Sequence, residues 1–214
     1  GDPILQGSAR PQQVDLTKLF SFDSRGQTIA NVAALRTLQP LSGTKFELQE
    51  SARLFRSNRT ILRLQKEATE AAFKSDAAIP TARVVSIATH GLLPKDIGDG
   101  AQEGGLVFSP PQTPTITDDG LLTPSEILAL NFRAEWIILS ACNTATAEQA
   151  GDTFSGLTRA FLFSGGTAVL ASHWRVNDEA TARLVSATLR MRVPNDRMTH
   201  AEALQAAMKE VRTD

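Results

Sequence analysis

The chain has 214 residues, a formal net charge of −1 and a hydrophobic content of 42%, a composition typical of globular proteins. Nucleic-acid binders need a basic face, and a membrane span needs roughly 18 consecutive apolar residues, so the composition argues against nucleic-acid and membrane partners. The single cysteine allows neither an intrachain disulfide nor a thiolate zinc cluster. The sequence therefore predicts a cytoplasmic protein without a metal or a cofactor.

Residues 1–80 have a less regular pattern than the rest of the chain. We predict helices over Ile29–Leu38, Gln49–Phe55 and Lys66–Lys74, and short strands at Phe46 and Thr60–Leu64. The opening segment Gly1–Leu5 resembles the end of a strand whose start is missing. We therefore expect one domain over residues 1–214, truncated at both ends, with its main chemistry in residues 81–214.

Strands and helices alternate from residue 81 onward. The predicted strands are Val84–Ala88, Leu106–Ser109, Trp136–Leu139 and Thr167–Ala171, with a long loop or hairpin over Leu92–Gly120. Predicted helices start at Thr123, Asn177 and Thr199, and another covers Asp152–Phe163. Capping boxes mark two of these starts, Thr123 with Glu126 and Thr199 with Glu202. Such alternation predicts an α/β fold with a mostly parallel sheet covered on both faces.

Two predicted strands end on residues that can react. His90 follows the strand Val84–Ala88, and Cys142, the only cysteine, follows the strand Trp136–Leu139. In parallel sheets the functional crevice lies beyond the carboxyl ends of the strands, so both residues belong at that edge. They are separated by about 50 residues, a spacing typical of caspase-type cysteine peptidases. The pattern favours a cysteine peptidase dyad.

The chemistry gives each residue a role. Cysteine attacks as a thiolate, and a nearby histidine can accept the thiol proton and later protonate the leaving amine. The tetrahedral intermediate needs hydrogen-bond donors, for which the N–H groups of Gly91 and Cys142 are the candidates. No acidic residue is assigned as a partner of His90.

Each of these residues also has a simpler interpretation. A lone cysteine in an apolar run is usually a small core residue, and a lone histidine is usually a structural group. His173 is a competitor for the role of the base, while His200 is expected to be solvated. Asp178 and Glu179 are most simply charges at a helix start.

Several segments resemble the CHAT domain, a family grouped with the caspases, separases and gingipains. The segments with the most specific motifs are Ala88–Gly91, Leu121–Ile127, Leu139–Thr144 and Ala171–Asp178. Further likeness at Gly1–Pro3, Leu41–Glu50 and Glu67–Glu70 extends the resemblance over nearly the whole chain.

The resemblance implies a caspase-like three-layer α/β/α sandwich, with His90 and Cys142 as a catalytic dyad in a bacterial, intracellular protein. It also implies regulation by an upstream sensor or repeat region. The leading hypothesis is a cysteine endopeptidase for a protein or peptide substrate, which would lie between the loop Leu92–Gly120 and the loop Ser172–Asp178. Substrate-binding residues are expected at Ser172, His173, Trp174 and Asp178.

Two alternatives stay open. The chain could be a non-catalytic CHAT-fold module that keeps the fold and binds a partner. It could also be a peptidase held latent by the absence of upstream sensor regions.

Overall fold

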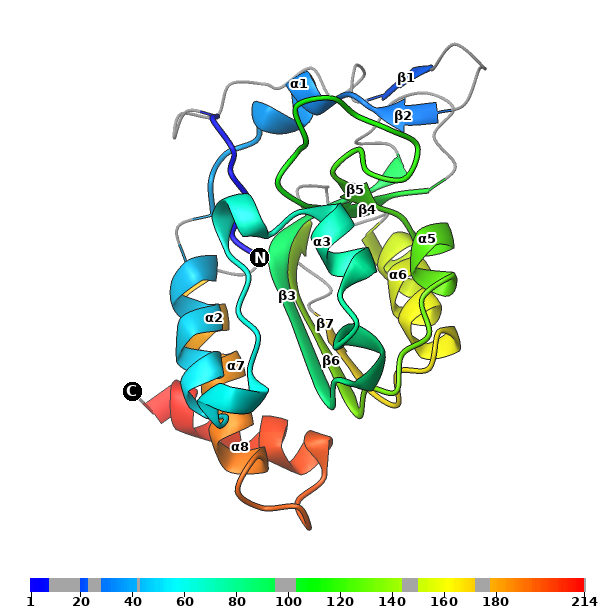
Figure 1. Ribbon diagram of the computed structural model, residues 1–214. Coiled ribbons are helices and arrows are strands. Elements are labelled where there is room, and N and C mark those ends of the chain that lie inside the picture. Colours follow the sequence, from blue (N-terminus) through cyan, green and yellow to red (C-terminus); the bar gives the residue numbers. More distant parts are fainter. Residues whose placement is uncertain are drawn as a thin grey trace.

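Within the described residues, five strands form a central mixed sheet in the order β5-β4-β3-β6-β7, and two form a small separate sheet (Figure 1). The structure, a computed structural model, describes residues 1–7, 20–22, 28–41, 43–94, 103–143, 150–171 and 178–213. At residues 20–22, 28, 57, 142–143, 150–155, 178 and 213 it describes the backbone alone. The strands are β1 (Phe20–Phe22), β2 (Thr28–Ala30), β3 (Val84–Leu92), β4 (Gly105–Val107), β5 (Leu121–Leu122), β6 (Trp136–Asn143) and β7 (Val169–Ala171). The α-helices are α1 (Val32–Arg36), α2 (Thr44–Arg53), α3 (Glu70–Ser75), α5 (Pro124–Leu128), α6 (Ala150–Phe163), α7 (Asp178–Arg192) and α8 (His200–Thr213), and the 3-10 helices are η2 (Ser57–Arg59), η3 (Gln65–Glu67) and η4 (Ile79–Thr81).

The central sheet is only partly parallel, which corrects the expectation of a mostly parallel sheet. β3, β6 and β7 are parallel to one another, whereas β4 and β5 are antiparallel to their neighbours. The cause is the segment Leu92–Gly120, which turns β4 back along the end of β3 as a hairpin and sets Gly91 opposite Leu106. The hairpin interpretation of this segment is thereby confirmed for its described residues.

Helices cover both faces of the sheet, so the α/β class is confirmed (Figure 1). One face places side chains such as Ile87 and Leu139 in a core with Phe161 of α6. The other face packs Trp136 and Ile138 against α7. Alternate residues of a strand point to opposite faces, and in β3 and β6 both faces are buried, as their nearly continuous apolar sequences predict. Among the described residues, no helix is both long enough and apolar enough to cross a bilayer.

Local capping explains where two helices begin. Thr123 accepts a hydrogen bond from the backbone N–H of Glu126, whose carboxylate accepts from the N–H of Thr123. Thr199 and Glu202 form the same reciprocal pair at the start of α8. Both predicted capping boxes are confirmed. The predicted cap of α7, Asn177, lies outside the described residues.

The amino-terminal predictions were less accurate. The predicted helix Ile29–Leu38 is partly wrong, since Ile29 belongs to β2 and Asn31 caps α1 by accepting from the N–H of Ala34. The predicted helix Lys66–Lys74 is divided, because Ala68 ends the 3-10 helix η3 and Thr69 caps α3. Phe46 lies in α2 rather than in a strand, and Thr60–Leu64 forms no strand.

Candidate active site

The backbone brings His90 and Cys142 together at one end of the sheet. They are opposite each other on β3 and β6, which are neighbouring parallel strands. Residues paired in this way belong to the same face of a sheet, and neighbouring strands are about 4.8 Å apart. The face is the one covered by α2 and α7, because Trp136 and Ile138, at even positions of β6 like Cys142, pack there. The side chain of Cys142 is outside what the structure describes.

The His90 ring is buried and is held by a backbone carbonyl. His90 is 6% exposed, and Nε2 of its ring lies 2.7 Å from the carbonyl oxygen of Gln39. A carbonyl oxygen can only accept, so Nε2 carries the proton in this contact and Nδ1 is the basic nitrogen of the neutral ring. The sequence did not indicate Gln39, because a backbone carbonyl leaves no residue-type signal.

Gly91, the first expected oxyanion donor, lies inside the ladder of the sheet. It is opposite Asn143 of β6 on one side and opposite Leu106 of β4 on the other. Thr89, two residues before Gly91, donates its hydroxyl hydrogen to the carbonyl of Val107. These contacts hold the carboxyl end of β3 between two strands, and a rigid support of this kind suits a catalytic group.

A buried carboxylate lies beneath this end of β6. Glu47 of α2 is 2% exposed, and its Oε1 accepts a hydrogen bond of 2.5 Å from the hydroxyl of Ser140. Ser140 precedes Cys142 by two residues and therefore belongs to the same face of the sheet. The pair ties α2 to β6 directly below the candidate nucleophile. Sequence reasoning missed Glu47 as a site residue, since a charged residue in the first turn of a helix is normally solvated.

A second charged cluster supports the β4–β5 hairpin. Glu70 is fully buried, and its Oε2 accepts from the N–H groups of Asp119 at 2.9 Å and Gly120 at 2.8 Å. Lys74 donates to Oε1 of Glu70 at 2.5 Å and to Glu126 at 2.8 Å. Burial raises the pKa of Glu70 to about 7, and the hydrogen bond from Lys74 opposes that rise. The cluster fixes the start of β5, which pairs with β4, the strand that lies beside Gly91.

The remaining predicted site residues are not brought into this arrangement by described atoms. Ser172, His173 and Trp174 lie outside the described residues, and Asp178 is described only as the first residue of α7. The solvated state expected for His200 is only partly correct: the residue is half-buried, and its ring packs on Trp136 with 4.5 Å between ring centroids. Burial and the nearby Arg192 lower the pKa of His200. Trp136 begins β6, so His200 lies at the opposite end of the sheet from His90.

The described part of the chain holds no group of three or more His, Cys, Asp or Glu side chains suited to a metal ion.

The sequence profile of the CHAT domain family matches residues 4–214. None of the curated proteins and none of the solved structures compared with this chain matches it.

Proposed function

The chain belongs to the CHAT domain family, and from this premise we propose that it is a cysteine endopeptidase with a caspase-like fold. Cys142 is the nucleophile, and His90 is the general base and acid. The observation that carries the proposal is the strand register, which pairs these two residues on one face at the carboxyl ends of β3 and β6. Helices on both faces of the parallel strands support the caspase-like sandwich.

The reaction follows from the tautomer of His90. Nε2 donates its hydrogen to the Gln39 carbonyl, and Nδ1, the other ring nitrogen, accepts the proton of the Cys142 thiol. The thiolate adds to the carbonyl carbon of the scissile peptide bond, and the N–H groups of Gly91 and Cys142 stabilise the oxyanion. The C–N bond breaks as His90 returns its proton to the amine. Water, deprotonated by His90, then hydrolyses the thioester and frees the acid.

The Gln39 carbonyl also stabilises the protonated ring. When the imidazole gains a positive charge, the Nε2–H···O contact becomes a charge-assisted hydrogen bond, which is roughly twice as strong as a neutral one. This backbone group takes the place of an acidic third member. The substrate is an extended protein or peptide segment at the sheet edge, where Ser172, His173, Trp174 and Asp178 contact it.

A cleavage assay with a peptide library tests the proposal. Cys142→Ala should reduce turnover to the uncatalysed rate, and His90→Gln should lower kcat/KM by roughly 10²–10⁴-fold, the usual contribution of general acid–base catalysis. An electrophilic peptide probe should label Cys142 in the unaltered protein and not in Cys142→Ala. His200→Gln is the matched histidine control, and turnover should not change, because His200 lies at the far end of β6.

The outcomes separate the three functional hypotheses. Probe labelling or turnover that survives Cys142→Ala would refute Cys142 as the nucleophile. Labelling of Cys142 without turnover would favour a peptidase kept latent by regions outside this chain. A protein that shows neither, while binding a partner through an intact fold, would favour the non-catalytic module.

A further inference from the structure

The carbonyl of Gln39, which holds His90, lies just beyond the end of helix α1. Leu35 of α1 and Leu38, the residue before Gln39, are buried, and both belong to the apolar cluster that contains Leu92 of β3. The place of this carbonyl therefore depends on how α1 is docked against the end of the sheet.

The segment that joins β4 to β5, residues 108–120, holds the start of α1. Asp119 is 9% exposed, and its Oδ2 accepts a hydrogen bond of 2.7 Å from the N–H of Ala30. Ala30 ends β2 and is followed by Asn31, which caps α1. Oδ1 of Asp119 accepts from the N–H of Leu121 at 3.0 Å. Both oxygens are engaged, so this one carboxylate joins β5 to the entry of α1.

An ionised carboxylate suits this position better than the amide of the same shape. Burial raises the pKa of Asp119, whereas the hydrogen bonds from Ala30 and Leu121 stabilise its charged form and lower the pKa. An Asn side chain has one accepting oxygen and would turn its NH₂ group toward one of the two N–H donors. Asp119→Asn should therefore break one of the two contacts without changing the volume of the side chain.

The end of α1 is held by the same segment. Nη2 of Arg36, the last residue of α1, donates to the carbonyl oxygen of Pro111 at 2.6 Å. From another side, the N–H of Gln6 donates to the carbonyl of Arg36 at 2.7 Å, and the N–H of Gly7 donates to the carbonyl of Leu38 at 3.1 Å. Both ends of α1 are thus joined to residues 108–120, and the chain is fixed up to the residue before the carbonyl that holds the histidine.

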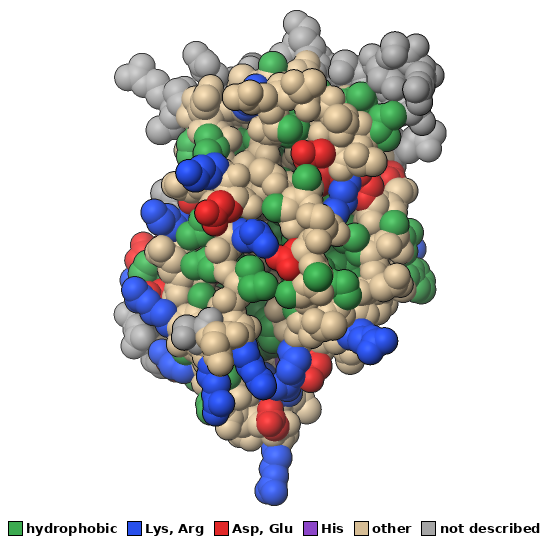
Figure 2. Space-filling view, viewed as in Figure 1, with side chains coloured by type: hydrophobic (Ala, Val, Ile, Leu, Met, Phe, Trp, Pro, Cys, Tyr) green, Lys and Arg blue, Asp and Glu red, His purple; other side chains and the backbone are tan. Residues whose placement is uncertain are grey.

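These contacts lie at the end of the sheet where β3 carries His90. The segment between β4 and β5, drawn in green, extends to α1 and β2 there (Figure 1). Most of the Lys and Arg side chains visible on this face gather at the other end of the molecule, around α8 (Figure 2). The docking of α1 therefore depends on its buried apolar side and on the contacts of Asp119 and Arg36.

We propose that Asp119 and Arg36 are positioning residues of the peptidase site, an inference that rests on the proposed function of His90 as general base and acid. They fix α1 at its two ends, and α1 holds the Gln39 carbonyl against Nε2 of His90. When either contact is lost, the carbonyl no longer holds the hydrogen on Nε2. Nδ1 is then the basic nitrogen in only part of the molecules.

The Nε2–H hydrogen of His90 tests the proposal without a substrate. The chain has three histidines, so nitrogen NMR of protein labelled at histidine resolves the ring, and His90→Gln identifies its signals. In Asp119→Asn and in Arg36→Met, the Nε2–H hydrogen should exchange with water at least about tenfold faster than in the unaltered protein, because the buried contact opens more often. The nitrogen shifts should also change from one tautomer to a mixture of two.

Peptide cleavage gives the second measurement. Each variant should lower kcat about ten- to hundredfold and change KM by less than about twofold, because a misplaced catalytic group slows the reaction more than it weakens substrate binding. Rates are normalised to the folded fraction, measured by circular dichroism. A merely structural role would lower the free energy of unfolding and leave the Nε2–H exchange of the folded protein unchanged.

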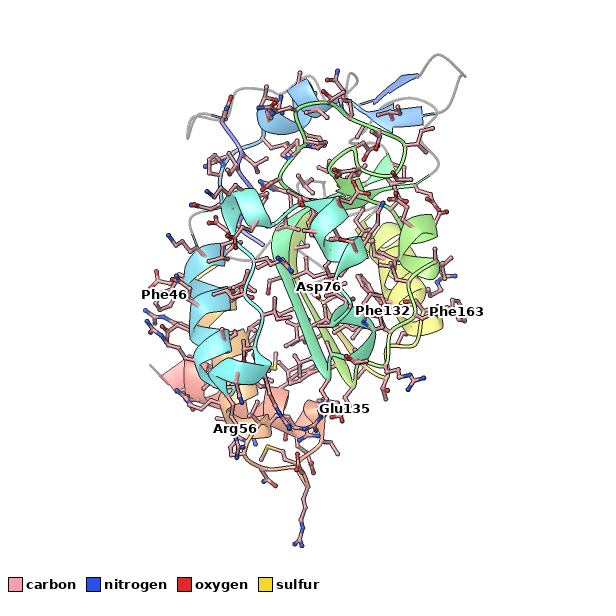
Figure 3. The ribbon with its side chains drawn as sticks, viewed as in Figure 1. Phe46, Arg56, Asp76, Phe132, Glu135 and Phe163 are labelled. Carbon is pink, nitrogen blue, oxygen red and sulfur yellow. The ribbon has the colours of Figure 1, made fainter. Side chains whose placement is uncertain are left out.

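Asp76→Asn is the matched control. Oδ1 of Asp76 also accepts from the N–H of the residue two positions on, Ala78, at 2.9 Å. Asp76 ends α3 and lies below that helix, away from α1 (Figure 3). This variant should change neither the Nε2–H exchange nor kcat. Arg36 is half-buried, and Met keeps much of its apolar stem, so Arg36→Met keeps the proposal testable if Asp119→Asn does not fold.

Unchanged Nε2–H exchange in either folded variant would overturn the role of that residue, and an equal change in Asp76→Asn would overturn the proposal for both. Failure of the proposed function is seen separately, as turnover that survives Cys142→Ala. Unchanged exchange in a protein whose turnover does depend on Cys142 would overturn this inference alone.

Discussion

The contact between Glu47 and Ser140 joins α2 to β6 two residues before the candidate nucleophile, and its strength can be measured. The carboxylate is 2% exposed, and the hydroxyl donates to it at 2.5 Å. A hydrogen bond to a charged group contributes about 1.5–3 kcal/mol, and a neutral one about 0.5–1.5 kcal/mol. Glu47→Gln keeps an accepting oxygen but removes the charge. Ser140→Ala should therefore cost about 1.5–3 kcal/mol in the unaltered protein and about 0.5–1.5 kcal/mol in Glu47→Gln.

The assay is a double-mutant cycle. The free energy of unfolding is measured by urea denaturation, followed by circular dichroism, for the unaltered protein, both single variants and the double variant. Ser75→Ala is the matched control, because its hydroxyl is exposed and bonds only within α3, to Ala71. That variant should change the free energy of unfolding by less than about 0.5 kcal/mol. An identical cost of Ser140→Ala in both backgrounds would refute a charge-assisted contact.

Two further predictions concern pH. Because burial raises the pKa of Glu70 from 4.5 to about 7, the folded state binds this proton more tightly than the unfolded state. The free energy of unfolding should fall by about 3 kcal/mol as the pH rises from 4.5 to 7. Glu70→Gln should remove that fall. Identical pH profiles of the two proteins in urea denaturation would contradict this prediction. For Gly1, burial lowers the pKa of the amino group, which means that the unfolded state binds more protons between pH 6 and 8, so stability should increase with pH over this interval. Acetylation of the amino group should abolish the increase, and a thermal-denaturation profile that keeps it would show that another group is responsible.

Apolar runs and capping boxes, which involve residues close in sequence, predicted much of the secondary structure. The strands that carry His90 and Cys142 were predictable because both sides of each strand are buried and the sequence is apolar throughout. The helices α5 and α8 were predictable because a capping box satisfies backbone groups within four residues. In each case the partners of the interaction are close in sequence.

The predictions from sequence were wrong where a residue far away in the chain determines which side chains are buried or which strands pair. In α2, Phe46 is 57% exposed while its neighbour Glu47 is buried. The hydrophobic pattern of the sequence predicts that Phe46 is buried and Glu47 is exposed. The pattern contains no information on Ser140, whose hydroxyl donates a hydrogen bond to the buried carboxylate of Glu47. The start of α2 was misplaced for the same reason. The mixed character of the sheet was missed because the pairing of β4 depends on how the segment after β3 turns back.

By itself, the sequence determined that His90 and Cys142 end two buried strands, since alternation, capping and apolar runs are local properties. Only the tertiary structure decided that these strands are neighbours in a register that sets the two residues side by side. It also decided that the Gln39 carbonyl orients His90 and that Asp119 accepts from the backbone of Ala30, just before α1. The physical reason is that strand pairing and backbone hydrogen bonds join groups present in every residue, so residue type does not reveal the partner.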